Sequence, residues 1–164
     1  MSDLRVLQIV EGTSVDGPGL RTSIYLAGCA HHCPLCHNPQ SWDFNGGHLT
    51  SVEELLKTIE YNVFPVTLSG GDPLYSARPL IPLLEQLKER NINVWCYTGF
   101  TLEHLLIFGD KYQRKLLEMI DVLVDGPFIS QYRDTSLRFR GSVNQRIIDM
   151  KTTLREGRIV LWDS

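Results

Sequence analysis

The stretch that decides the fold is residues 22–38, which read TSIYLAGCAHHCPLCHN. A short apolar run, typical of a strand covered on both faces, leads directly into a loop with three closely spaced cysteines. In a reducing compartment such a cluster is more typical of a metal site than of disulfide bonds. The cysteines are Cys29, Cys33 and Cys36, so the loop after this strand is the first candidate for a functional site.

The spacing of the cysteines leaves more than one kind of metal open. Three thiolates can bind three irons of a 4Fe-4S cluster, and the fourth iron is then free to bind a small molecule directly. A zinc site of the Cys3His type would use the same residue types, although a second downstream cysteine pair is absent from the chain. Buried thiols without a metal are a third alternative. A ferredoxin-like electron carrier is disfavoured, because it would need a fourth clustered cysteine.

Outside the loop, apolar β-branched runs alternate with amphipathic runs, a pattern that predicts β-α units around a parallel sheet. The predicted strands span residues 5–10, 22–28, 66–69, 93–97, 121–124 and 158–162, and the predicted helices span residues 52–61, 79–89, 101–107 and 113–120. A complete eightfold β/α barrel needs ~250 residues. The 164 residues are therefore expected to form one α/β domain, residues 1–164, built as a partial β/α barrel with an open, curved sheet.

Polar or glycine-rich segments follow the predicted strands. They are Gly70-Gly71-Asp72-Pro73, Thr98-Gly99 and Asp125-Gly126-Pro127. Because ligands of α/β sheets bind at the carboxyl ends of the strands, these segments and the cysteine loop are expected to share one rim. The paired glycines either let the backbone approach a ligand closely or form a tight turn, and Asp125 either binds a ligand or starts a turn.

Composition narrows the location and the partners. The net charge is −3, so no field of one sign points to nucleic acid or to an anionic membrane surface. No stretch reaches the ~20 apolar residues of a membrane span, and no signal peptide is visible. The sequence therefore predicts a cytoplasmic protein that binds neither nucleic acid nor membrane.

Several motifs carry a resemblance to a known family. The stretches Val15-Asp-Gly-Pro-Gly-Leu-Arg21 and Cys29-x3-Cys33-x2-Cys36-His-Asn38, with Trp42, resemble the signature of glycyl-radical activating enzymes, which belong to the radical S-adenosylmethionine superfamily. Four later stretches are similar to the anaerobic ribonucleoside-triphosphate reductase branch: Leu68-Ser-Gly-Gly-Asp72, Trp95-Cys-Tyr-Thr-Gly99, Val124-Asp-Gly-Pro-Phe128 and Arg140-Gly-Ser-Val-Asn-Gln-Arg146. The resemblance covers residues 11–148.

The resemblance implies a set of site residues. It makes Cys29, Cys33 and Cys36 the ligands of one 4Fe-4S cluster, with no catalytic residue beyond them. It places S-adenosylmethionine against Leu35, Cys36, His37, Gly70, Gly71, Asp72, Thr98, Asp125, Gly126 and Pro127. Leu35 stands where many members have an aromatic residue, and His37 either stacks on adenine or caps the loop. His31 and His32 are expected at the loop surface or in partner contacts, and Cys96 in the core.

The resemblance also implies an activity. Reductive cleavage of S-adenosylmethionine at the cluster would yield a 5′-deoxyadenosyl radical, which removes hydrogen from a glycine of anaerobic ribonucleotide reductase. Flavodoxin or ferredoxin would supply the electron. Segments 16–21 and 138–146 would then dock the reductase, or else be a turn and a solvated basic face. The alternatives are an activator of the pyruvate formate-lyase type and, in another class, a zinc-binding interaction module.

Overall fold

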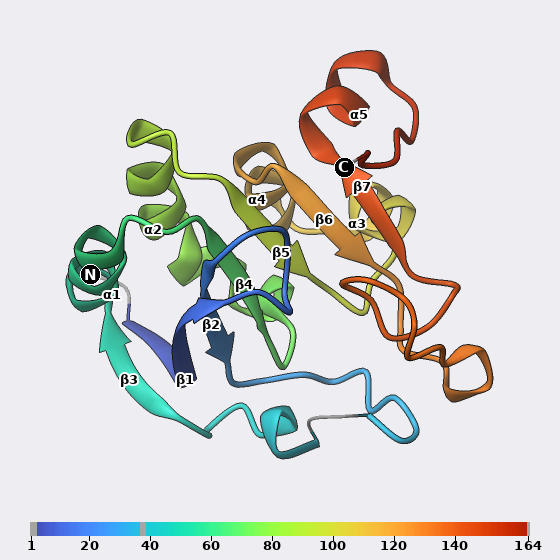
Figure 1. The fold of residues 1–164 in the computed structure, drawn as a ribbon, viewed down its shortest axis with the longest axis horizontal. Coiled ribbons are helices and arrows are strands. Elements are labelled where there is room, and N and C mark those ends of the chain that lie inside the picture. Colours follow the sequence, from blue (N-terminus) through green and yellow to red (C-terminus); the bar gives the residue numbers. More distant parts are fainter. Residues whose placement is uncertain (1–2, 37–38, 164) are drawn as a thin grey trace.

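The computed structural model describes residues 3–36 and 39–163, which form one seven-stranded sheet in the order β3-β1-β2-β4-β5-β6-β7 (Figure 1). The strands are β1 (Asp3–Thr13), β2 (Arg21–Leu26), β3 (His48–Ser51), β4 (Val66–Gly70), β5 (Val94–Tyr97), β6 (Val122–Asp125) and β7 (Arg146–Asp149). The α-helices are α1 (Val52–Asn62), α2 (Ala77–Glu89), α3 (Leu102–Phe108), α4 (Lys111–Met119) and α5 (Met150–Glu156). Short 3-10 turns lie at η1 (Pro39–Trp42), η2 (Pro73–Ser76) and η3 (Ser130–Tyr132). No helix in the described ranges is long and apolar enough to cross a bilayer.

The centre of the sheet is parallel, as the alternating pattern predicted. Strands β2, β4, β5 and β6 pair in parallel, and helices connect β4 to β5 and β5 to β6. The flanks differ from the prediction, because β1 runs antiparallel to both β2 and β3, and β7 runs antiparallel to β6. The connection between β1 and β2 is too short for the crossover that a parallel pair requires. The fold is therefore a mixed α/β sheet.

One predicted strand is wrong. Residues 158–162 do not form a strand, and their bridge to the sheet is the single pair Ile148 and Leu161. The edge strand is β7 instead. Trp162 packs edge-on against Trp95, with ring centroids 5.0 Å apart, so this apolar segment covers an aromatic cluster rather than extending the sheet.

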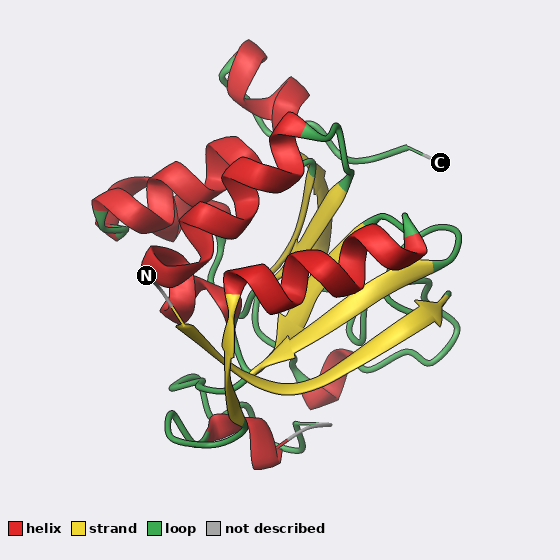
Figure 2. Ribbon diagram, turned by 90° about the vertical axis from the view of Figure 1, so that its left-hand side faces the viewer, coloured by secondary structure: helices red, strands yellow, loops and turns green. Residues whose placement is uncertain are grey.

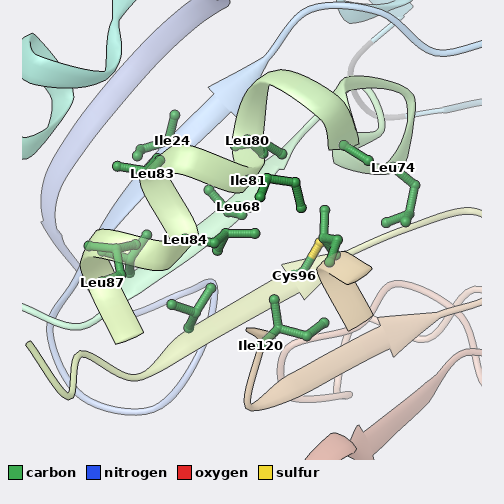
Figure 3. Packing of buried hydrophobic residues seen from close by; sticks show 14 of the residues in the cluster. Ile24, Leu68, Leu74, Leu80, Ile81, Leu83, Leu84, Leu87, Cys96 and Ile120 are labelled. Atoms are coloured by element: carbon green, nitrogen blue, oxygen red, sulfur yellow. The ribbon is translucent and has the colours of Figure 1, made fainter. Parts of the chain in front are cut away.

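The helices cover one face of the sheet (Figure 2). Because side chains alternate along a strand, Ile24, Leu68 and Cys96 point to the same face and pack beneath α2 (Figure 3). Cys96 is fully buried there, which confirms its predicted place in the core. The opposite face carries Trp95 and, on β2 and β4, polar side chains. The two faces of the sheet are thus chemically distinct.

Arg21 begins β2 and lies on that polar face, only 2% exposed. Its guanidinium donates hydrogen bonds to the Thr67 hydroxyl (2.9 Å), the Val66 carbonyl (2.9 Å) and the Asn93 side-chain oxygen (2.8 Å). Burial lowers its pKa to about 10, so it stays charged at neutral pH. Arg21 therefore joins β2 to β4 and to the start of β5, and the expected docking role for this residue is wrong because its side chain is inside the protein.

Replacing Arg21 with Met should lower the free energy of unfolding by about 3 kcal/mol, because the buried Thr67 hydroxyl and Val66 carbonyl lose their charged donor. Urea unfolding measures the change. Arg114→Met, at an exposed position of α4, is the matched control and should stay within about 0.5 kcal/mol of the wild type. Equal losses in the two variants would contradict a structural role for Arg21.

Candidate metal centre at the carboxyl ends of the parallel strands

A cavity of about 520 Å³ lies at the carboxyl ends of the parallel strands. It is reached by the loop after β2, the ends of β4 and β5, and the long segment between β6 and β7, which meet on one side of the sheet (Figure 1). Seven of the predicted site residues line it: Cys29, Cys33, Cys36, Gly70, Gly71, Thr98 and Gly126. The structure therefore brings the three cysteines and the paired glycines together around one space.

The other predicted site residues lie elsewhere. Leu35 is 77% exposed at the tip of the cysteine loop, with a left-handed φ of 58°. Asp72 and Asp125 are buried, and neither of them lines the cavity. Pro127 is not among the lining residues either. His37 lies outside the described residues.

The glycine motif packs directly against the strand that leads to the cysteines. The Gly71 N–H donates to the Leu26 carbonyl (2.7 Å), and the Asp72 N–H donates to the Gly28 carbonyl (2.9 Å). A Cβ on Gly71 would lie 2.5 Å from the Gly28 carbonyl oxygen, which real side chains do not tolerate. Glycine is thus required here to bring two backbone segments together, and the same approach leaves backbone facing the cavity.

The cysteine loop is held by backbone hydrogen bonds at its base. The Gly28 N–H donates to the Ser41 carbonyl (2.8 Å), and the Cys29 N–H donates to the Trp42 carbonyl (3.3 Å). Burial raises the pKa of Cys29 to about 11 and also raises the pKa of Cys33. These thiols are protonated at neutral pH in the metal-free protein, so a metal that binds them must displace protons.

The three thiols fit a multinuclear cluster. An iron–sulfur cluster places its irons at separate corners, so its ligands need to surround a space rather than meet at one point. Three thiols around one cavity, beside the paired glycines Gly70 and Gly71, satisfy that requirement.

Asp72 is fully buried, and its carboxylate accepts three hydrogen bonds. A fourth contact joins it to His31, whose Nε2 lies 2.6 Å from Asp72 Oδ2. Of the two places expected for His31, exposure at the loop surface is wrong, because this contact holds its ring inward at 16% side-chain exposure, while contact with a partner stays a prediction. His32 is exposed as predicted and stacks on Trp42, with ring centroids 4.4 Å apart. The cysteine spacing held no signal that distinguished the two histidines.

Asp125 is tied to the protein in a similar way. Its carboxylate accepts hydrogen bonds from Arg146 Nε (3.0 Å), from Arg146 Nη2 (2.5 Å) and from the Leu102 N–H at the start of α3 (2.8 Å). Arg146 also makes two hydrogen bonds to Glu103. Arg146 thus joins β7 to β6 and α3 through ion pairs and is not a free arginine on a solvated basic face, while contact of segment 138–146 with the reductase stays a prediction.

Sequence reasoning missed part of the cavity lining. Tyr25 and Tyr97 also line it, as does Asp16 of the segment that was expected to dock the reductase. The hydroxyls of Tyr25 and Ser23 both donate to Asp16 Oδ2, and the Tyr97 hydroxyl donates to the Phe139 carbonyl (2.6 Å). Period-two alternation along β2 and β5 places these tyrosines opposite the helices, and this was the available signal.

Comparison with known proteins gives the class of the chain. A family described as "4Fe-4S single cluster domain" matches residues 15–148. Among solved structures, QueE from Escherichia coli is similar with a TM-score of 0.51 and 20% identity, over 60% of this chain and 53% of that one, which supports the fold alone. The fold and the match together define an α/β protein of the single-cluster iron–sulfur class.

Curated relatives narrow the class further. The anaerobic ribonucleoside-triphosphate reductase-activating protein of Haemophilus influenzae is 36% identical over 88% of this chain and 97% of its own length. The proteins of the same name from Escherichia coli K12 and from Enterobacteria phage T4 are 32% and 33% identical, over 89% and 86% of their lengths. The chain belongs to the family of anaerobic ribonucleoside-triphosphate reductase-activating proteins.

The bond from Arg146 lowers the pKa of Glu103, so Arg146→Met should raise that pKa toward its usual value. Because the folded-state pKa lies below the unfolded one, the associated stabilisation is present above about pH 4.3 and is lost as the pH falls through the folded value. An NMR titration of the Glu103 carboxyl carbon measures the shift. Arg155→Met, which removes an ion pair to Glu156 instead, should leave the pKa of Glu103 unchanged. An equal change in the pKa of Glu103 in this variant would contradict the role assigned to Arg146.

Proposed function

We propose that this chain is an oxidoreductase that activates anaerobic ribonucleotide reductase by radical S-adenosylmethionine chemistry. The observation that carries the proposal is that Cys29, Cys33, Cys36 and the Gly70-Gly71 motif line one cavity. The family membership and the names of the relatives support the same activity. When bound, the reduced 4Fe-4S cluster supplies the electron that splits S-adenosylmethionine into methionine and the 5′-deoxyadenosyl radical, which takes hydrogen from a reductase glycine.

The residues of the chain would position these groups. The three cysteine thiolates would hold three irons and leave the fourth open to S-adenosylmethionine. The backbone at Gly70 and Gly71 would receive the methionine end, and backbone near Thr98 and Gly126 the remainder. The carboxylates of Asp72 and Asp125 would act from behind, because both are buried and already accept hydrogen bonds from the protein. Leu35 and His37 would contribute around the adenine.

The partners follow from the same assignment. The protein substrate would be the reductase, whose glycine loop would enter the cavity past the segment that connects β6 to β7. Flavodoxin or ferredoxin would deliver the electron to the cluster. The concave sheet would be a partial, open β/α barrel, and residues 1–164 would be a single domain. One continuous sheet with two hydrophobic clusters on its faces supports this architecture.

The test compares two cysteine variants after anaerobic reconstitution with iron and sulfide. Cys33→Ala should lose the cluster, and cleavage of S-adenosylmethionine to 5′-deoxyadenosine should fall to background, because one iron loses its ligand. Cys96→Ala, a cysteine in the core, should keep both cluster and activity. Iron, sulfide and zinc analysis, with product measured by chromatography, gives the readout.

The outcome also separates the alternatives. A protein that takes up zinc and never iron would contradict the proposal and favour a binding module. Cleavage without a glycyl-radical signal on the reductase, but with one on pyruvate formate-lyase, would move the chain to another branch of activators. A glycyl-radical signal on the reductase that depends on Cys33 would support the proposal in full.

A further inference from the structure

His31 lies between two of the proposed cluster ligands, two residues after Cys29 and two before Cys33. Its side chain is 16% exposed, and its Nε2 is 2.6 Å from Oδ2 of the fully buried Asp72. Asp72 immediately follows the paired glycines at the end of β4. The contact therefore joins the cysteine loop to the glycine motif.

Asp72 also accepts hydrogen bonds from three other groups. Oδ2 also accepts from the Thr98 hydroxyl (2.8 Å) and the Gly99 N–H (2.9 Å), and Oδ1 accepts from the Leu74 N–H (3.0 Å). The Leu74 and Gly99 N–H groups can only donate, so both carboxylate oxygens act as acceptors, and the His31 tautomer with its proton on Nε2 completes the set of donors. This charge-assisted bond compensates part of the cost of burying the carboxylate.

The ring of His31 is enclosed by Tyr75, Gly99 and Phe100, which together form a slot for it. Phe100 contacts it edge-on with ring centroids 4.5 Å apart, and Tyr75 closes another side at 5.6 Å. The third wall is Gly99, where an added Cβ would lie 2.6 Å from His31 Cδ2. The slot is therefore built from the turn after β4 and the loop after β5, and it depends on a glycine to admit the ring.

We propose that His31 is a positioning residue that fixes the cysteine loop to the ends of β4 and β5. The inference rests on the proposed function and deepens it, because it assigns how the cluster is held in register with the S-adenosylmethionine site. The bond sets where Cys29 and Cys33 lie relative to Gly70 and Gly71 before any cluster is bound. Its partner Asp72 acts through His31 and through the backbone rather than by touching the ligands.

The first experiment replaces His31 with Ala and with Gln. Gln can place its Nε2 the same number of bonds from the backbone as the histidine Nε2, so it should restore the bond. The control is His32→Asn, an exposed histidine in the same loop whose left-handed φ of 50° suits asparagine. Hydrogen exchange of residues 29–36 is followed in the cluster-free protein, and S-adenosylmethionine binding is followed by the change in the reduced cluster's EPR spectrum.

His31→Ala should speed exchange in the loop and weaken S-adenosylmethionine binding by about tenfold or more, as loss of a partner behind the ligands typically does. Turnover per cluster at saturating S-adenosylmethionine should change less than KM does. His31→Gln should recover most of the affinity. If His31→Ala matches the wild type in exchange and in binding, the inference is overturned.

The second experiment tests the slot itself. Gly99→Ala should disturb the loop in the wild-type background, because the new methyl group would displace the His31 ring. In the His31→Ala background the same substitution should add little, since the ring is gone. Equal effects in both backgrounds would overturn the inference, because they would place the clash elsewhere.

The two proposals fail in different ways. If the wild type holds no cluster and cleaves no S-adenosylmethionine, the proposed function fails, while hydrogen exchange in the cluster-free variants still decides the role of His31. If the wild type is active and neither exchange nor binding responds to His31→Ala, the positioning role fails alone.

Discussion

The site depends on the close approach of two strand ends, those of β2 and β4. Gly70 has a left-handed φ of 104°, and a Cβ there would lie 2.3 Å from the Leu26 nitrogen. Only glycine permits this backbone packing, which places the glycine motif beside the segment that enters the cysteine loop. Asp72 follows at once and is fixed by its N–H bond to the Gly28 carbonyl. Asp72 is in turn linked to the end of β5, because its carboxylate accepts hydrogen bonds from the Thr98 hydroxyl and the Gly99 N–H.

Two buried carboxylates therefore connect the segments at the carboxyl ends of the strands without lining the cavity. Asp72 collects donors from the cysteine loop and from the end of β5, and Asp125 collects Arg146 and the first turn of α3. Both act as internal acceptors, and neither residue lines the cavity. An anionic cluster with thiolate ligands would be disfavoured next to unpaired carboxylates. Burying these two charges against donors keeps the space suited to such a group.

The parallel strands and their exits were predictable because each is a short apolar run followed by glycine or a polar residue, as at Leu68 and Gly70. The edge strands His48–Ser51 and Arg146–Asp149 were not, since their residues are mostly exposed or half-buried and carry little pattern. Within the site, local sequence indicated the cysteines and the glycines. The roles of His31 and Arg21 depend on partners more than 40 residues away, which no local pattern encodes.

The direction of β7 has a practical consequence for handling the molecule. Its first residue, Arg146, pairs with Asp125 at the rim, and its last, Asp149, pairs with Val122 at the far end of β6. The chain then turns away into α5 and ends on the side of the sheet opposite the cysteine loop (Figure 1). An affinity tag or a fluorescent protein fused after Ser164 would extend from that distant end. Immobilisation through the carboxyl terminus would thus present the cavity outward to whatever must reach it.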